Sequence, residues 1–217
     1  MSQLDSRLAL CASFVRQGKK LADIGTDHAY LPVWLCQNGV TPRAVAADIN
    51  PGPLRRGAQT VAKAGLSDRI ETRLSDGLKN IDAGEAEDIV IAGMGGELIA
   101  RILDECTFSR DSEKHFILQP MTRSEELIRW LNANGFSILG QDCCLAADKC
   151  YTVLSVSYTG APAADDELYP YLGKLDPGNN ATHLRFVEGH IRRLLKQAKG
   201  EARFAALAEK LKKRCGK

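Results

Sequence analysis

The order of apolar and helical segments in the first 134 residues leaves few folds open to this chain. Five short apolar segments have the character of buried strands and cover residues 20–24, 43–49, 69–74, 87–92 and 115–118. A first amphipathic helix is expected over residues 4–15, and further helical patterns cover residues 33–37, 51–65, 97–105 and 124–134. Strands that alternate with helices predict a parallel sheet with helices on both faces. We therefore expect a doubly wound α/β fold.

Two more strand segments, residues 137–143 and 151–158, follow without a helix between them. Strands this close in sequence pair antiparallel, so we expect a mostly parallel seven-stranded sheet with an antiparallel strand. The composition then shifts to Gly, Pro, Asp and Asn, before apolar residues return at helical spacing on both sides of Gly200. These patterns predict one domain over residues 1–158, a linker over 159–182 and a helical hairpin over 183–217.

The predicted hairpin is strongly basic. Residues 181–217 contain eleven Lys or Arg and three Glu, whereas the whole chain of 217 residues has a formal net charge of +2. A basic segment on an acidic body is typical of a protein that binds a polyanion. A solvated helix rich in lysine gives the same pattern and is the alternative interpretation.

Cysteine spacing and hydropathy exclude several classes of protein. The seven cysteines include no C-x-x-C pair, so we expect reduced thiols in a cytoplasm and no metal site. No apolar run is long enough to span a membrane, and the first residues lack the pattern of a secretory signal. With 44% hydrophobic and 26% charged residues, the chain has the composition of a soluble globular protein, not of a disordered chain or a coiled-coil rod.

Acidic residues and glycines gather where the predicted parallel strands end. Ligands bind at this edge of an open α/β sheet, near the point where the strand order reverses. The clusters comprise Asp23, Gly25 and Asp27 after the first strand, Asp48 and Asn50 after the second, Asp76 and Gly77 after the third, Gly93, Gly95 and Gly96 after the fourth, and Gln119 after the fifth. Five such clusters in register predict a ligand site at this edge.

The first of these loops, DIGTDH, has the wrong chemistry for a pyrophosphate. A dinucleotide fold carries G-x-G-x-x-G here, but in this chain carboxylates surround a single glycine and would repel phosphate. S-adenosylmethionine fits better, because it carries an ammonium and a sulfonium and no phosphate. Asp48 is placed to accept hydrogen bonds from two ribose hydroxyls, and Asp76 to hold the adenine amino group. NAD also has a ribose, so an NAD-dependent oxidoreductase is the alternative, which the missing phosphate cradle disfavours.

Each of these residues also has a purely structural interpretation. Gly25 serves any turn that needs a positive φ, and Asp76 followed by Gly77 is a common turn pair. Asp23 could cap a helix, and His28 could be a half-buried, hydrogen-bonded side chain.

Several longer segments carry a family resemblance. LADIGTDHAYLP, AADINPGPL, SDGL, IAGMGGELI and ILQP occur in this order, and together they resemble the bacterial tRNA (adenine(22)-N1)-methyltransferase family from about residue 5 to residue 158. The resemblance is most specific at residues 23–32 and 91–96. It implies a Rossmann-like class I methyltransferase domain followed by a helical, coiled-coil-like extension. It also implies that S-adenosylmethionine is bound by Asp23, Gly25, Asp27, His28, Tyr30, Asp48, Ile49, Asp76, Gly77, Ala92, Gly93 and Met94, with the segment 92–95 near the methyl group and the target base.

The implied reaction is methylation of N1 of adenosine 22 in tRNA. Methyltransferases that act on exocyclic amino groups usually carry an Asp/Asn/Ser-Pro-Pro-aromatic motif after the fourth strand, whereas this chain has GMGG, which suits a ring nitrogen. N1 has an in-plane lone pair, so we expect direct in-line attack on the methyl carbon, with the Asp27 carboxylate stabilising the charge that moves to the base. Asp27 could equally bind only the cofactor. The candidate phosphate contacts to the RNA are Arg185, Arg192, Arg193, Lys196, Lys199 and Arg203.

Two other classes of function remain open. A methyltransferase for a small molecule or a protein would have a lid over its pocket and no role for the basic hairpin. A non-catalytic cofactor-binding protein would keep the fold without turnover. We expect a cytoplasmic monomer that binds tRNA and requires neither a metal nor a membrane.

Overall fold

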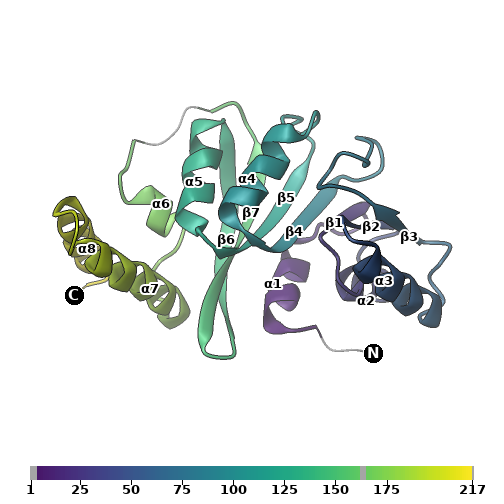
Figure 1. Cartoon of the computed structure of the whole chain (residues 1–217), viewed down its shortest axis with the longest axis horizontal. Helices are drawn as coiled ribbons and strands as arrows, with labels where there is room; N and C mark the ends of the chain where they lie inside the picture. The colour runs from purple at the N-terminus through teal and green to yellow at the C-terminus, as the bar shows by residue number, and fades with distance from the viewer. Residues whose placement is uncertain (1–3, 162–164, 217) are drawn as a thin grey trace.

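A seven-stranded sheet forms the centre of the molecule in the computed structural model, which describes residues 4–161 and 165–216 (Figure 1). Its order is β3-β2-β1-β4-β5-β7-β6, with β1 (Leu21–Ile24), β2 (Ala44–Asp48), β3 (Ile70–Leu74), β4 (Asp88–Gly95), β5 (His115–Thr122), β6 (Phe136–Ala146) and β7 (Lys149–Tyr158). The first five strands are parallel, and β7 runs antiparallel to both β5 and β6. The predicted fold, a mostly parallel sheet with an antiparallel strand, is confirmed.

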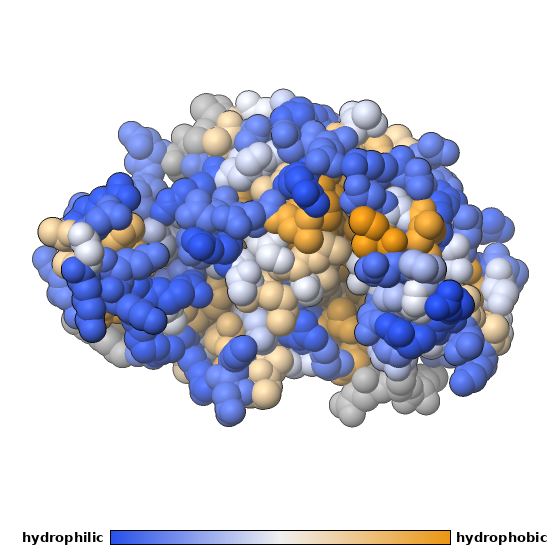
Figure 2. All heavy atoms as spheres, in the orientation of Figure 1, coloured by the Kyte–Doolittle hydropathy of each residue, from blue (hydrophilic) through white to orange (hydrophobic). Residues whose placement is uncertain are grey.

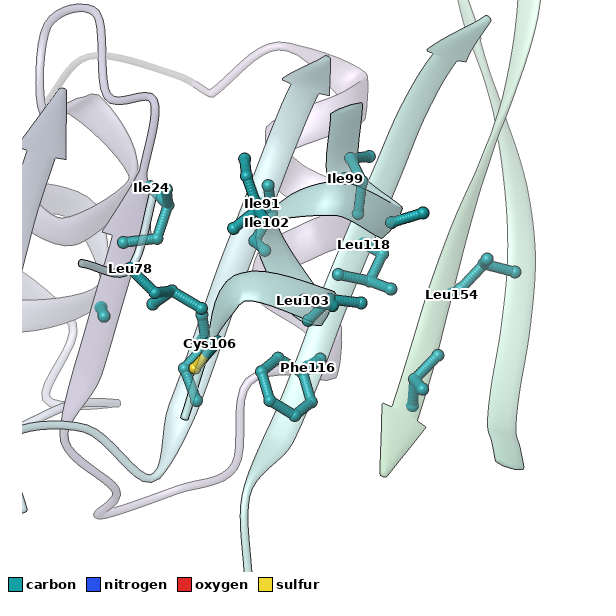
Figure 3. Packing of buried hydrophobic residues seen from close by; sticks show 14 of the residues in the cluster. Ile24, Leu78, Ile91, Ile99, Ile102, Leu103, Cys106, Phe116, Leu118 and Leu154 are labelled. Atoms are coloured by element: carbon teal, nitrogen blue, oxygen red, sulfur yellow. The ribbon is translucent and has the colours of Figure 1, made fainter. Parts of the chain in front are cut away.

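Helices cover both faces of this sheet. One face carries α1 (Ser6–Phe14), α2 (Tyr30–Gln37) and α3 (Pro51–Lys63), and the other carries α4 (Gly96–Glu105) and α5 (Ser124–Ala133). Successive strand residues point to opposite faces, so Val90 of β4 belongs to the first core and Ile91 to the second. Figure 3 shows the second core, where Ile91 and Leu118 of adjacent strands lie close to Leu103 of α4. Burial on both faces explains why the central strands are continuously apolar.

The strand order reverses beside β1. The chain passes from β1 to β2 on one side of it, and after β3 it returns to β4 on the other side. The segments that follow β1 and β4 therefore leave the sheet at the point where an open α/β sheet binds its ligand.

The C-terminal segment packs against the antiparallel end of the sheet and contains α6 (Tyr169–Leu172), α7 (Ala181–Gln197) and α8 (Arg203–Arg214) (Figure 1). Its core joins Tyr171 of α6, Val187 of α7 and Leu211 of α8 to Cys143 of β6. The helices α7 and α8 pack on each other. The expected linker, residues 159–182, includes α6, and its residues 162–164 lie outside the described part of the chain. The division of the chain at residues 158 and 182 stays a prediction.

Helix α5 has no side-chain cap, although a Thr and a Ser precede its acidic first turn, a pattern that often provides one. Thr122 is part of β5 instead, because β4 pairs with β5 as far as Gly95. Arg123 occupies the N-cap position with a φ of +56°, and its carbonyl accepts hydrogen bonds from the N–H groups of Glu126 and Leu127.

Candidate active site

The loop after β1 is fixed by β2 on one side and by β4 on the other. Gly25 has a φ of +81°, and the N–H groups of Gly25 and Thr26 both donate to the carbonyl of Ala47, at 2.8 and 2.9 Å. A Cβ at Gly25 would lie 2.2 Å from Cε of Met94. Gly25 is therefore favoured by its backbone conformation, and the Met94 side chain fills the space beside it.

Two acidic side chains are buried at the ends of β1 and β2. Asp23 is 6% exposed and Asp48 is 9% exposed. Burial raises the pKa of Asp23 to about 6 against a hydrogen bond from Thr26, and the charge of Asp48 adds to the increase. Oδ1 of Asp48 accepts a hydrogen bond from the N–H of Asn50 at 2.7 Å. Within the described residues neither carboxylate has a cationic partner, so the pair suits a ligand that brings a cation or hydroxyl groups.

Asp27 is exposed and already has a cationic partner. Its carboxylate accepts a hydrogen bond from Arg56 of α3, and Nε2 of His28 lies 3.4 Å from it. The His28 ring stacks on Tyr30, with centroids 5.0 Å apart and planes 7° from parallel. Tyr30 also starts α2, three residues earlier than the pattern predicts, after a left-handed Ala29. Arg56 was not predicted, because its contact with Asp27 joins α3 to the loop after β1 across 29 residues of sequence.

The loop after β3 carries the predicted adenine contacts. The Asp76 carboxylate is 2.6 Å from Nζ of Lys79, and the hydrogen bond from this lysine holds the Asp76 pKa below its usual value. Gly77 has a φ of +59°, and a Cβ there would lie 3.0 Å from Cγ1 of Ile102. Asp76 is thus engaged, and an adenine amino group would have to share it with Lys79.

Two large apolar side chains are exposed at the same edge of the sheet. Ile49 is 58% exposed and Leu74 is 54% exposed. Leu74 pairs in register with Asp48, and Ile49 directly follows Asp48, so both flank this carboxylate. Figure 2 shows hydrophobic surface gathered over the middle of this face of the molecule. An exposed apolar pair beside a carboxylate suits a flat base attached to a ribose. Leu74 was not predicted, although its place as the last residue of the third strand could have indicated it.

The end of β4 is irregular where the methyl group is expected. The register with β5 shifts on both sides of Met94, and Gly93 has a φ of +79°. The Gly93 N–H donates to Oε1 of Gln119 at 3.1 Å, and Nε2 of the same buried side chain donates to the carbonyl of Pro120 at 3.0 Å. Gln119 therefore fixes the backbone next to Ala92 and Gly93.

The predicted RNA contacts lie apart from these acids. Arg185, Arg192, Arg193, Lys196, Lys199 and Arg203 are all exposed, on α7, on the first residue of α8 and between the two helices. Figure 2 shows that the surface over these helices is mostly hydrophilic. Two of the six have acidic neighbours, since Arg193 is 3.5 Å from Glu125 and Arg203 is 2.8 Å from Glu201.

Several kinds of site have no basis in the part of the chain that the structure describes. Within residues 4–161 and 165–216 no group of three or more His, Cys, Asp or Glu could hold a metal ion. No helix in the same residues has the length and apolar composition to cross a membrane. The seven cysteines are free thiols, and Cys143 is buried in the C-terminal core.

Comparisons with known proteins agree with this geometry. A family model described as a methyltransferase domain matches residues 4–154. The tRNA (adenine(22)-N(1))-methyltransferase of Bacillus subtilis (strain 168) is 36% identical over 173 residues, which cover 80% of this chain and 73% of that protein. A Streptococcus pneumoniae structure in complex with S-adenosyl-L-methionine matches with a TM-score of 0.89 and 30% identity, over 98% of this chain and all of that one. A structure from M. capricolum in complex with S-adenosyl-homocysteine matches with a TM-score of 0.80 and 26% identity, over 98% and 96% of the two chains.

Proposed function

This chain belongs to the tRNA (adenine(22)-N1)-methyltransferases within the methyltransferase-domain family, and on that premise we propose that it methylates N1 of adenosine 22 in tRNA. The family resemblance stated from the sequence is thereby confirmed. The observation that carries the proposal is the buried acid pair, Asp23 and Asp48, which has no cationic partner among the described residues and lies where such a fold binds its ligand.

The residues at this edge fit S-adenosylmethionine as the methyl donor. Bound there, the cofactor supplies a methyl group on a cationic sulfur. Asp48 accepts hydrogen bonds from the ribose hydroxyls, and Ile49 and Leu74 offer apolar surface to the base. Asp23 provides negative charge in a buried place, where attraction to a cation is least screened by water. The donor set contains no phosphate cradle, which fits this cofactor and not NAD.

The chemistry requires positioning more than proton transfer. Adenine N1 carries a free in-plane lone pair, so no base has to remove a proton before attack. The hydrogen bond from Gly93 to Gln119 fixes the backbone beside the reacting atoms, and the Met94 side chain lies against Gly25. Asp27 is the candidate for stabilising the positive charge that reaches the base. Its pairing with Arg56 equally supports a role in orienting the loop after β1.

The basic surface of α7 and α8 provides the phosphate contacts for the tRNA. Arginine and lysine contacts to phosphates orient a nucleic acid without reading its bases. N1 lies on the Watson–Crick edge, so the target base has to be exposed before it reacts. A cytoplasmic monomer remains the expectation from the sequence.

The decisive experiment supplies labelled S-adenosylmethionine and two unmodified tRNA transcripts that carry A or G at position 22. We expect N1-methyladenosine in the A transcript alone, identified by mass spectrometry of the nucleosides. Cofactor binding without transfer to either transcript would contradict the proposal and favour a small-molecule or protein substrate. A melting temperature that rises with NAD and not with S-adenosylmethionine would favour the oxidoreductase alternative.

A further inference from the structure

A groove of about 1030 Å³ runs between α5 and the C-terminal helices. It starts at Thr122 and Arg123, at the end of β5, and its far wall includes Arg193 of α7 and Phe204 of α8. Thr122 pairs in register with Gly95 at the end of β4. The groove therefore begins beside the segment where the proposed methyl transfer takes place and leads toward the basic helices.

The cationic side chains that line this groove are Arg123, Arg129, Arg193, Lys196 and Arg203. Three of them have partners, because Arg129 donates to the hydroxyl of Tyr171, Arg193 lies beside Glu125 and Arg203 beside Glu201. Arg123 and Lys196 form no hydrogen bond or ion pair through their side chains within the described residues. Of these two, Arg123 is the one at the carboxyl edge of the sheet.

Acidic side chains also line the groove, and two of the three are neutralised. Glu125 has Arg193 as its neighbour at 3.5 Å, and Glu167 forms an ion pair with Lys210 of α8. Glu126 alone keeps its charge without a partner in the described part of the chain. The groove thus presents more free positive than negative charge to a ligand.

The backbone holds Arg123 in a conformation that glycine would adopt more easily. Its φ is +56° and its ψ is 38°, in the left-handed region that a long side chain rarely occupies. Its carbonyl oxygen is wedged against α4, since a Cβ on Gly96 would lie 2.1 Å from it. No local hydrogen bond of the guanidinium offsets this strain within the described residues. Strained residues of this kind gather at functional sites.

We propose that Arg123 binds a tRNA phosphate at the target nucleotide, as the contact between the groove and the methyl-transfer edge. The inference rests on the proposed function and adds a substrate-binding residue to it. Guanidinium pairs with phosphate through two parallel N–H groups, which fixes direction as well as distance. The backbone of Arg123 is held rigidly, so this contact fixes the position of the phosphate. It thereby also positions the base of the same nucleotide.

Three substitutions separate charge from conformation. Arg123→Asn and Arg123→Gly both accept a positive φ and remove the charge, whereas Arg123→Lys keeps the charge. For the Asn and Gly variants we expect a KM for tRNA about tenfold higher, a salt slope of tRNA binding smaller by about 0.7–1, and unchanged affinity for S-adenosylmethionine. For Arg123→Lys we expect the KM for tRNA to rise by less than about threefold. The melting temperature of Arg123→Gly should equal or exceed that of the wild type, because the strain is relieved.

Arg110→Asn is the matched control, since Arg110 is an exposed arginine before β5, at the opposite edge of the sheet. Its KM and salt slope should match those of the wild type. A wild-type KM and salt slope in Arg123→Asn would overturn the inference while the proposed function stands, and so would an equal loss in Arg110→Asn. A wild-type protein that binds the cofactor but methylates no tRNA would overturn both proposals together.

Discussion

The charge on Asp23 costs the folded protein stability. Its side chain is 6% exposed, and burial raises its pKa to about 6. The pKa of an ordinary Asp is about 3.9. The shift therefore corresponds to a loss of about 3 kcal/mol in the free energy of unfolding when Asp23 ionises. A cationic ligand restores part of that loss when it binds. Asp23 thus has the energetics of a binding residue, because a buried acid without a cationic partner is a poor structural element.

Asp23→Asn should therefore stabilise the protein while it weakens cofactor binding. The folded pKa lies above the unfolded one, so the native state keeps its extra proton at low pH and wild-type stability falls as the pH rises from about 4 to about 6. We expect the variant to be more stable than the wild type by up to about 3 kcal/mol at pH 7.5, and by little at pH 4. Urea unfolding at the two pH values measures the difference, and calorimetry measures the cofactor affinity. An equal gap at both pH values would show that the ionisation of Asp23 is not its cause.

The sequence could predict which residues end the strands, but not which side chains meet there. Asp23 and Asp48 follow from the hydrophobic pattern, because the strand ends are where apolar runs stop and parallel strands align their ends. Arg56 and Gln119 act through contacts with Asp27 and Gly93 that no local pattern encodes. Such contacts depend on the angle at which helices and bulged strands pack.

At the scale of elements, α4 packs tightly against the segment before α5 at Gly96. A Cβ there would lie 2.1 Å from the carbonyl oxygen of Arg123 and 3.1 Å from Cβ of Leu127. The nearest of these atoms belongs to the backbone, so it cannot move aside as a side chain can. The glycine is thus required by packing between two elements, although its own φ is ordinary.

Gly96→Ala should destabilise the protein by about 1–3 kcal/mol, the usual cost of forcing an atom into a packed contact. Gly189→Ala is the matched control, because Gly189 lies inside α7 and a Cβ there meets nothing nearer than 3.9 Å. That variant should gain about 0.5–1 kcal/mol from better helix propensity. Chemical denaturation of both variants tests the pair. Equal effects would mean that helix propensity, and not the contact with Arg123, governs position 96.

Tertiary pairing also explains where the predicted elements differ from the observed ones. The strand expected over residues 115–118 continues to Thr122, because β4 goes on pairing with it as far as Gly95, through two shifts of register. The composition of residues 159–182 resembles a linker, yet Tyr171 and Leu172 of α6 are buried against the C-terminal helices. The composition of a segment indicates how much apolar surface it could bury. It does not indicate whether another part of the chain packs against that surface.

At the scale of the whole molecule, the acids of the candidate active site and the cations of the hairpin are kept apart. Residues 181–217 hold eleven of the 29 Lys and Arg residues of the chain, and the sheet carries the buried acids at its other end. A polyanion attracted to the basic end would reach the active site along the groove between α5 and the C-terminal helices. The arrangement therefore assigns binding and chemistry to different parts of the fold.

Neutralising Arg192, Lys196 and Lys199 together, each to Gln, tests that division. Their side chains are exposed and have no ion pair within the described residues, so their loss should leave the fold intact. We expect weaker tRNA binding with a salt slope smaller by about 2–3, because binding through fewer phosphate contacts releases fewer counterions. The affinity for the cofactor should not change. The matched control replaces Arg43, Lys63 and Arg110 at the opposite edge of the sheet and removes the same charge. If both triple variants lose the same affinity, net charge alone attracts the RNA. If the hairpin variant keeps the wild-type slope, α7 and α8 are solvated helices, and the RNA contacts have to be sought along the groove at Arg123.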